Sequence, residues 1–136
     1  MPTIVYFDTN FYLDYFYNRR DNIRPLGEFA HQALIKVFSG DYSVVVSDWL
    51  LEEISKNKAS EPMNELIERL KEAKKYVYVS TGSEDIQRAK KLPTHKQDAL
   101  HVILALKAGA TILVTNNLND FLPCSNLIDC VLPMNF

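Results

Sequence analysis

The sequence predicts a single α/β domain, a three-layer α/β/α sandwich around a mostly parallel sheet of about five strands. Short apolar runs alternate along the chain with longer stretches in which apolar residues recur at helical spacing. The apolar runs are nearly continuous, as expected for strands that helices cover on both faces. The chain has 136 residues and shows no internal repeat, low-complexity tract or linker. This length is typical of one domain.

The first half of the chain contains two predicted strands and four predicted helices. Thr3 to Phe7 is an apolar strand, and a helix over Phe11 to Tyr17 follows it. Leu26 to Phe38 repeats apolar residues at helical spacing and ends at a serine–glycine pair. Tyr42 to Val46 is β-branched and bounded by turn residues, which predicts a buried strand. The next two helices are predicted to begin at N-cap serines, Ser47 for a helix through Asn57 and Ser60 for a helix with an apolar stripe.

The second half continues the alternation. Tyr76 to Val79 is the third predicted strand, and Ser83 to Leu92 a short helix. Thr94 and Gln97 have the spacing of a capping box, which predicts the start of a helix over Lys96 to Lys107 with Gly109 as its C-cap. The last two strands are expected at Thr111 to Val114 and Asn126 to Leu132.

Composition narrows the class of protein. The hydrophobic share of 47% and the charged share of 24% are ordinary for a globular domain. No apolar run approaches the ~20 residues of a membrane helix, and Met1 to Phe7 does not resemble a signal peptide. Cys124 and Cys130 lack a zinc-type spacing and are too few for a disulfide framework. We therefore expect a cytoplasmic protein with no membrane partner.

Acidic and amide side chains follow the predicted strands, at the sheet edge where ligands of parallel α/β proteins bind. They are Asp8 and Asn10 after the first strand, Asp48, Glu52 and Glu53 after the second, Thr115, Asn116, Asn117 and Asp120 after the fourth, and Asp98 in the helix before it. Each acid taken alone is also consistent with a turn, a helix cap or an exposed helix surface. Asp8 and Asp98, however, lie in apolar sequence surroundings, where a carboxylate is costly unless it is paired or binds a metal.

Four segments in a fixed order resemble the PIN domain nucleases, and most of all the toxin half of VapBC-type toxin–antitoxin pairs. The segments are Phe7 to Asn10, Ser47 to Glu53, Asp98 to His101 and Thr115 to Phe121. Together they span nearly the whole chain. Each motif is weak alone, and the ordered match of all four is what carries the resemblance.

The resemblance implies a catalytic set of four acids, which are Asp8, Glu53, Asp98 and Asp120. Glu53 is favoured over Glu52 because the family pattern places its glutamate six residues after Ser47. Asp8, Asp98 and Asp120 would bind Mg²⁺ or Mn²⁺, which prefer oxygen ligands. Asn10 would orient Asp8, and Thr115 and Asn117 would support the site by hydrogen bonds.

Two positions depart from the family pattern. Asn116 stands where many relatives have arginine, which weakens phosphate contact, and Asn117 stands where some have aspartate. His101, three residues after Asp98, is expected to be a second-layer or core residue rather than a metal ligand. Trp49, Tyr12, Tyr15 and Tyr17 are either base-stacking residues or, as is more usual at helical spacing, part of the core or an interface.

The expected function is therefore a metal-dependent endoribonuclease whose antitoxin partner lies in the active-site groove. Two alternatives remain open, a stand-alone RNA-processing nuclease and a catalytically silent RNA-binding or interaction module of the same fold. A homodimer is also expected, through the helices over Phe11 to Tyr17 and Leu26 to Phe38. The net charge of −2 argues mildly against a nucleic-acid partner, but a metal-binding acidic cluster lowers this total. A nucleotide-binding α/β domain is disfavoured, since no glycine-rich phosphate loop is present.

Overall fold

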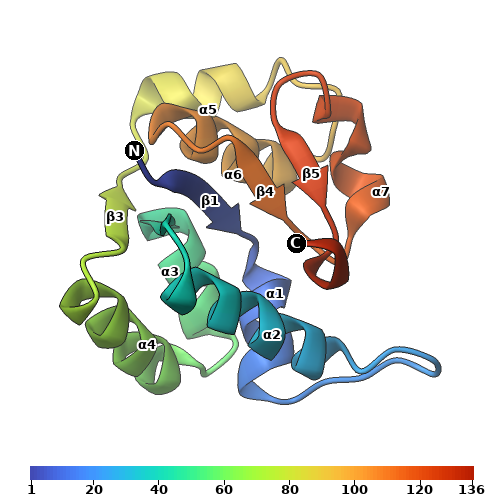
Figure 1. Ribbon diagram of the computed structural model, residues 1–136. Helices are drawn as coiled ribbons and strands as arrows, with labels where there is room; N and C mark the ends of the chain where they lie inside the picture. Colours follow the sequence, from blue (N-terminus) through green and yellow to red (C-terminus); the bar gives the residue numbers. More distant parts are fainter.

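A five-stranded parallel sheet forms the centre of the computed structural model, which describes residues 1–136 (Figure 1). The strand order is β3-β2-β1-β4-β5. The strands are β1 (Thr3–Phe7), β2 (Tyr42–Ser47), β3 (Tyr76–Val79), β4 (Ile112–Val114) and β5 (Asp129–Val131). All four neighbouring pairs run parallel. The predicted five strands and parallel sheet are confirmed, although β5 is shorter than the predicted Asn126 to Leu132.

Seven α-helices connect the strands and cover the sheet. They are α1 (Thr9–Phe16), α2 (Leu26–Ser39), α3 (Asp48–Lys56), α4 (Ser60–Glu72), α5 (Ser83–Ala89), α6 (Lys96–Lys107) and α7 (Leu118–Phe121). Short 3₁₀ turns occupy Leu122–Cys124 and Pro133–Asn135. No helix combines the length and the apolar character that crossing a membrane requires.

Two separate apolar cores confirm the three-layer sandwich. Alternate residues of a strand point to opposite faces, so Val5 and Phe7 of β1 pack with α1 to α4, whereas Tyr6 packs with α5 and α6. Figure 1 shows the same division, with α5 to α7 on one side of the sheet and α1 to α4 on the other. Because both faces are covered, the carboxyl-terminal parts of the central strands β1, β2 and β4 are buried, which explains their continuous apolar sequences.

The direction of chain progression reverses between β1 and β4. From β1 the chain adds β2 and β3 on one side, and it then returns to place β4 and β5 on the other side. The carboxyl ends of β1 and β4 therefore lie next to each other at a topological switch point, where ligands of parallel α/β folds bind. Asp8 follows β1 and Thr115 follows β4, so these two side chains meet at this point.

The helix starts confirm the predicted cap at Ser47, whereas the caps predicted at Ser60 and Thr94 were wrong. The Ser47 side chain accepts a hydrogen bond from the Leu50 amide at 3.0 Å, as predicted. Ser60 is the first residue of α4 rather than its cap, because Ala59 occupies the cap position. The capping box at Thr94 was wrong: His95 caps α6.

Tertiary contact explains why the Thr94 prediction failed. The Thr94 hydroxyl donates to the peptide oxygen of Asp120, which the α7 segment brings to it from 26 residues away. His95 Nδ1 then accepts from the Gln97 amide at 3.3 Å. Gly109, the predicted helix stop, follows the C-cap residue Ala108 and has a φ of +84°, which suits glycine.

Candidate active site

Asp8 is fixed at the switch point by two hydrogen bonds. Its Oδ1 accepts from the Phe11 amide at 3.0 Å, which makes Asp8 the N-cap of α1. Its Oδ2 accepts from the Thr115 hydroxyl at 2.7 Å, a contact that joins the ends of β1 and β4. The carboxylate is only 4% exposed. Each of its oxygens accepts one hydrogen bond and keeps capacity for another partner.

The structure corrects the orienting role predicted for Asn10. The Asn10 side chain is exposed and makes no hydrogen bond to Asp8. Because Asp8 occupies the N-cap position, the free amide of Phe11 is the donor within its reach. The residues that orient Asp8 are therefore Phe11, through its backbone, and Thr115.

Asp8 is buried and has no cationic partner. The desolvation of its carboxylate raises the pKa of Asp8 to about 6, although the hydrogen bonds from Thr115 and Phe11 and the charge of His101 act to lower it. No lysine or arginine forms an ion pair with it. A carboxylate in this state gains stability from any cation that can reach it.

Glu53 forms the second acidic position, and a histidine holds it. Its Oε1 lies 2.6 Å from His101 Nε2 and 2.5 Å from the Thr9 hydroxyl. Burial acts to raise the pKa of Glu53, but the hydrogen bond and charge of His101, with smaller contributions from Thr9 and Lys56, together lower it. Glu52, the alternative candidate, forms an ion pair with Lys56 at 3.5 Å, and its side chain is 59% exposed. The two neighbouring glutamates thus have distinct surroundings.

A buried hydrogen-bond chain continues from Glu53 into the sheet. His101 is 3% exposed, and its Nδ1 lies 2.6 Å from the Tyr6 hydroxyl. That hydroxyl lies 2.9 Å from Ser47 Oγ, the cap of α3. His101 was predicted to be a second-layer or core residue, whereas Tyr6 was not predicted as part of the site. The one available signal was a hydroxyl-bearing side chain in the middle of an otherwise apolar central strand.

Asp98 and Asp120 lie on the other side of the site. Asp98 is partly buried near the start of α6 and makes no hydrogen bond or ion pair. Burial raises the pKa of Asp98, and the charges of Asp120 and Glu53 add to this rise, whereas His101 opposes it. Asp120 is exposed. Asp98 is therefore a second carboxylate without a cationic partner.

His101 is the side chain that links three of the predicted acids. Its charge lowers the pKa of Asp8, of Glu53 and of Asp98. No three acidic, histidine or cysteine side chains converge closely enough to hold a metal ion by themselves. A divalent cation still suits this donor set, because magnesium is commonly bound by one or two carboxylates and keeps several waters. Burial raises the pKa of Asp8, Asp14 and Asp98, but Asp14 pairs with Arg19, whereas Asp8 and Asp98 form no ion pair.

The residues after β4 have roles that the sequence did not reveal. Asn116 donates from Nδ2 to Asp14 Oδ2 at 3.0 Å, and Arg19 lies 3.8 Å from the same buried carboxylate. The side chain of Asn117 is exposed, and its amide donates to Thr115 Oγ1 at 2.9 Å. Asn117 thus supports Thr115 through its backbone rather than through its side chain.

A polar cleft of about 250 Å³ opens beside Glu53. Asn10, Arg19, Lys56 and Gln97 are among the residues that line it. Asp8, Asp98 and Asp120 are not part of this lining. The cleft therefore places Arg19 and Lys56 next to Glu53. The carboxylates of the three aspartates lie outside its lining.

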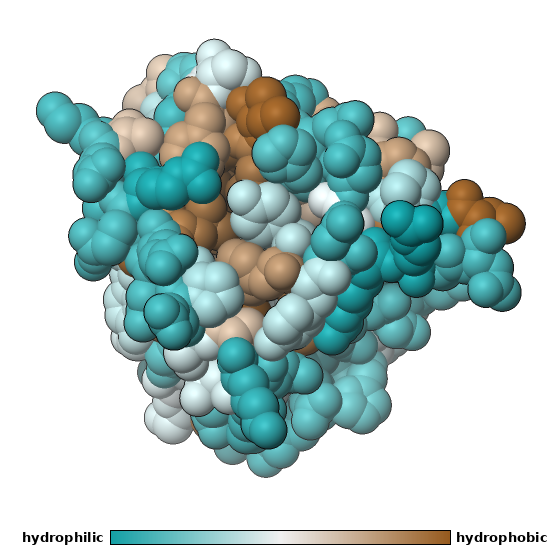
Figure 2. Space-filling model, turned by 90° about the horizontal axis from the view of Figure 1, so that it is seen from below, coloured by the Kyte–Doolittle hydropathy of each residue, from teal (hydrophilic) through white to brown (hydrophobic).

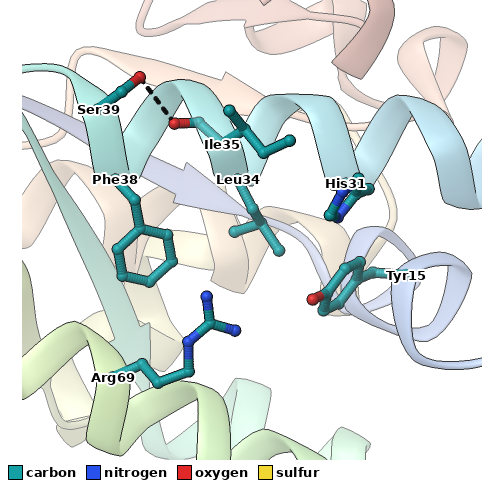
Figure 3. Close-up of a pocket in the computed structure, with 7 residues that line it drawn as sticks. All are labelled: Tyr15, His31, Leu34, Ile35, Phe38, Ser39 and Arg69. Atoms are coloured by element: carbon teal, nitrogen blue, oxygen red, sulfur yellow. Dashed lines mark hydrogen bonds between the residues drawn. The ribbon is translucent and has the colours of Figure 1, made fainter.

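A second, mostly apolar cavity of about 310 Å³ lies away from the acids, between α1, α2 and α4 (Figure 3). Leu34, Ile35 and Phe38 line it together with Arg69 and Tyr15. Figure 2 shows apolar side chains gathered in a hollow on this face of the molecule.

The aromatic helix α1 contributes mainly to the core. Phe11 and Tyr12 are fully buried, which rules out base stacking by Tyr12 and removes both from any dimer surface. Tyr15 stacks on His31 at the rim of the apolar cavity, with ring centroids 6.1 Å apart. The Tyr17 hydroxyl donates to the Asn57 peptide oxygen at 2.7 Å.

Comparison with known proteins gives a family and two structural neighbours. The family model described as PIN domain matches residues 4–119. A toxin–antitoxin complex from Klebsiella pneumoniae has a chain 18% identical, with a TM-score of 0.62, covering 95% of this chain and 97% of its own. VapBC2 from Rickettsia felis, bound to a DNA fragment from its promoter, has a chain 18% identical with a TM-score of 0.62, covering 96% and 98%. The search of curated proteins found no significant match.

Proposed function

The chain belongs to the PIN domain family, and from this premise we propose that it is a divalent-metal-dependent endoribonuclease, the toxin of a toxin–antitoxin pair. One observation carries the proposal. At the switch point of the sheet, Asp8 is buried without a cationic partner, and Glu53, which accepts a hydrogen bond from the next residue Thr9, has its pKa lowered by contact with His101. This combination of an uncompensated carboxylate and a charged one is suited to a metal-assisted hydrolase.

The proposed cofactor is Mg²⁺ or Mn²⁺, held by Asp8 and Asp98. Asp120 would take part through a bound water, since no three acidic side chains converge closely enough to hold the ion directly. When bound, such an ion lowers the pKa of a water and offsets negative charge that develops on a phosphate. The fit rests on the oxygen donors of these side chains and on the raised pKa values of Asp8 and Asp98. The hydrogen bonds from Phe11 and Thr115 hold Asp8 in one orientation for this task.

Glu53 is proposed to act on the attacking water. Its Oε1 is occupied by His101 and Thr9, whereas its Oε2 makes no hydrogen bond within the chain. Oε2 is therefore free to accept a proton from a water in the cleft. The water oxygen bonds to phosphorus, the bond from phosphorus to O3′ breaks, and O3′ takes up a proton from a second water, while Glu53 releases its proton to solvent. The products are a 5′-phosphate and a 3′-hydroxyl.

The proposed partners are an RNA substrate and an antitoxin protein, and the proposed location is the cytoplasm. Both structural neighbours come from toxin–antitoxin complexes, which supports the antitoxin. The antitoxin is proposed to occupy the cleft beside Glu53, where Arg19 and Lys56 favour an acidic segment. Occupation of this cleft would exclude RNA.

Cleavage of RNA under defined metal conditions tests the proposal. Structured and single-stranded RNAs are incubated with the wild type, Asp8→Asn and Asp98→Asn, with added Mg²⁺ or Mn²⁺ and with excess chelator. The wild type should cleave only with metal, and each variant should be slower by roughly 1,000-fold, because metal coordination supplies several kcal/mol of the rate acceleration. Activity that persists in chelator or in both variants would contradict the proposal.

A further inference from the structure

Resting on the proposed ribonuclease function, we propose that the cavity between α3, α5 and α6 binds a nucleobase of the RNA beside the cleaved phosphate, with Trp49 as its wall. This cavity has a volume of about 280 Å³. Its lining is Trp49, Ile86, Ala89, Lys96, Gln97 and Leu100. It is distinct from the acidic site and from the apolar cavity between α1, α2 and α4.

The cavity adjoins the polar cleft that holds Glu53, and the two share part of their walls. Trp49 and Gln97 line both spaces. Trp49 lies four residues before Glu53, so the two side chains are one helical turn apart on the same face of α3. A nucleotide whose phosphate lies beside Glu53 can therefore place an adjacent base against Trp49 without a change in the backbone of the protein.

The lining has the chemistry that a base requires. Ile86, Ala89 and Leu100 supply an apolar surface, and Trp49 supplies an aromatic one on which any base can stack. The Gln97 amide both donates and accepts hydrogen bonds, as the edge of a base does. This mixture favours a flat, polar-edged aromatic ligand over a purely aliphatic one.

Charge around the cavity favours a polyanion. The two adjoining spaces are lined by three cationic side chains, Arg19, Lys56 and Lys96, and by one acidic side chain, Glu53. Outside this lining, Arg19 pairs with Asp14 and Lys56 pairs with Glu52. The protein as a whole has a formal charge of −2. Lys96 forms no ion pair, so it is the cation of this lining that is free to contact a phosphate of the RNA.

The indole of Trp49 is only partly buried and is held by packing alone. Its Nε1 is inaccessible to solvent and has no hydrogen-bond partner. The ring packs against the core that contains α6. Since no hydrogen bond fixes it, the ring can adjust to a base at little cost in polar contacts.

Trp49 is the only tryptophan in the chain, so its fluorescence reports on this cavity directly. The probe is a single-stranded RNA hexamer, and the reference is an abasic hexamer with the same phosphates. Both are titrated into the Asp8→Asn variant in chelator, which prevents cleavage. The RNA should quench the fluorescence in a saturable manner, and the abasic hexamer should bind more weakly and leave the fluorescence unchanged. Equal quenching by both would overturn the base subsite.

Two substitutions in the Asp8→Asn background test the subsite, so that the result does not depend on Trp49 alone, a residue that also packs against the core. Trp49→Leu should weaken RNA binding by about 10-fold or more, as loss of a stacked base predicts, when measured by the anisotropy of labelled RNA. Ile86→Asp, at a side chain that is 37% exposed and therefore tolerant of change, should also weaken binding while Trp49 remains. Ile35→Asp, in the other cavity, is the matched control and should leave RNA affinity unchanged.

The outcomes separate this proposal from the proposed function. Saturable, base-dependent quenching without cleavage by the wild type would leave the subsite standing and contradict the nuclease. Metal-dependent cleavage by the wild type with no fluorescence response to bound RNA would contradict the subsite alone. Failure of RNA to bind in the anisotropy assay would overturn the subsite, and the cleavage assay on the wild type with metal would still decide the nuclease function.

Discussion

Glu53 Oε1 lies 2.6 Å from His101 Nε2, and this contact joins α3 to α6 beneath the polar cleft. His101 is itself fixed by the Tyr6 hydroxyl on the central strand, 2.6 Å from its Nδ1. The orientation of the cleft glutamate is therefore set by a buried chain of side chains rather than by solvent. Positioning residues of this kind are as necessary as the groups that they hold.

Replacing His101 should change the pH dependence of cleavage. In His101→Phe only the hydrogen bond from Thr9 and the charge of Lys56 would remain to oppose burial, so the pKa of Glu53 should rise. The acidic limb of the rate profile should therefore move to higher pH, and the rate at pH 7 should fall by roughly 10- to 100-fold. His101→Gln, which retains a donor, should recover part of the rate. A profile of unchanged shape would show that His101 acts only on folding.

The two neighbouring glutamates should differ sharply in their effect on activity. Glu53→Gln removes the proposed proton acceptor, and the cleavage rate should fall by about 100-fold or more. Glu52→Gln is the matched control, since its side chain is 59% exposed and pairs only with Lys56. It should retain the wild-type rate within about twofold, because exposed ion pairs contribute little. The reverse ranking in a single-turnover assay would assign the site to Glu52.

Asp8 should make the metal-free protein less stable as the pH rises. The pKa of Asp8 in the folded state is raised from 3.8 to about 6, so the folded state binds a proton more tightly than the unfolded state. Stability from this group is present below pH 3.8 and is lost as the pH rises through 6. The loss is on the order of 3 kcal/mol, at about 1.4 kcal/mol per pKa unit.

Urea denaturation in chelator at pH 4.5 and pH 7 checks this sign. Asp8→Asn should lack this contribution and be more stable than the wild type at pH 7, since asparagine can accept from Phe11 and donate to Thr115. The difference between the two proteins should shrink at pH 4.5. A variant that is less stable than the wild type at pH 7 would mean that Asp8 is already compensated within the chain.

Divalent metal should stabilise the wild type through the same carboxylates. Ligand present at about 100 times its dissociation constant adds about 2.7 kcal/mol to the free energy of unfolding. Mn²⁺ should therefore raise the Tm of the wild type and of Glu52→Gln, but not that of Asp8→Asn or Asp98→Asn. Calorimetric titration of the same four proteins measures the stoichiometry. Equal stabilisation of all four would place the metal elsewhere.

Thr115→Val should remove the hydrogen bond that Thr115 donates to Asp8, together with the one that it accepts from the Asn117 backbone amide. The substitution keeps the side-chain volume and removes the donor 2.7 Å from Asp8 Oδ2. The pKa of Asp8 should rise further, because this hydrogen bond lowers it. Metal affinity should fall by roughly 10-fold, as is usual when a partner of a metal-binding side chain is lost. An unchanged affinity in calorimetry would show that Thr115 serves the fold alone.

The fold was largely predictable because its signals are local. Each strand is a short apolar run with turn residues beside it, and the Ser47 cap is read from its neighbours alone. The Thr94 capping box failed because the Asp120 segment, distant in sequence, takes the hydroxyl of Thr94. Local patterns cannot anticipate such competition.

The candidate site was predictable only in part for the same reason. The positions of Asp8 and Glu53 followed from strand ends and from the family spacing. The bond from Thr115 to Asp8 spans 107 residues, and that from His101 to Tyr6 spans 95. Asn10, adjacent in sequence, was expected in the role that Thr115 and the Phe11 amide fill. Proximity along the chain is thus a poor guide to which side chain orients a buried acid.

A crystal structure with Mn²⁺, with the ion located by its anomalous scattering, tests the central claim most directly. The ion should lie between the carboxylates of Asp8 and Asp98, with oxygen ligands at about 2.0–2.6 Å, the distances of hard divalent cations in proteins. Waters should complete its coordination, and one of them should face Glu53. A fully loaded crystal in which the ion contacts neither Asp8 nor Asp98 would contradict the account.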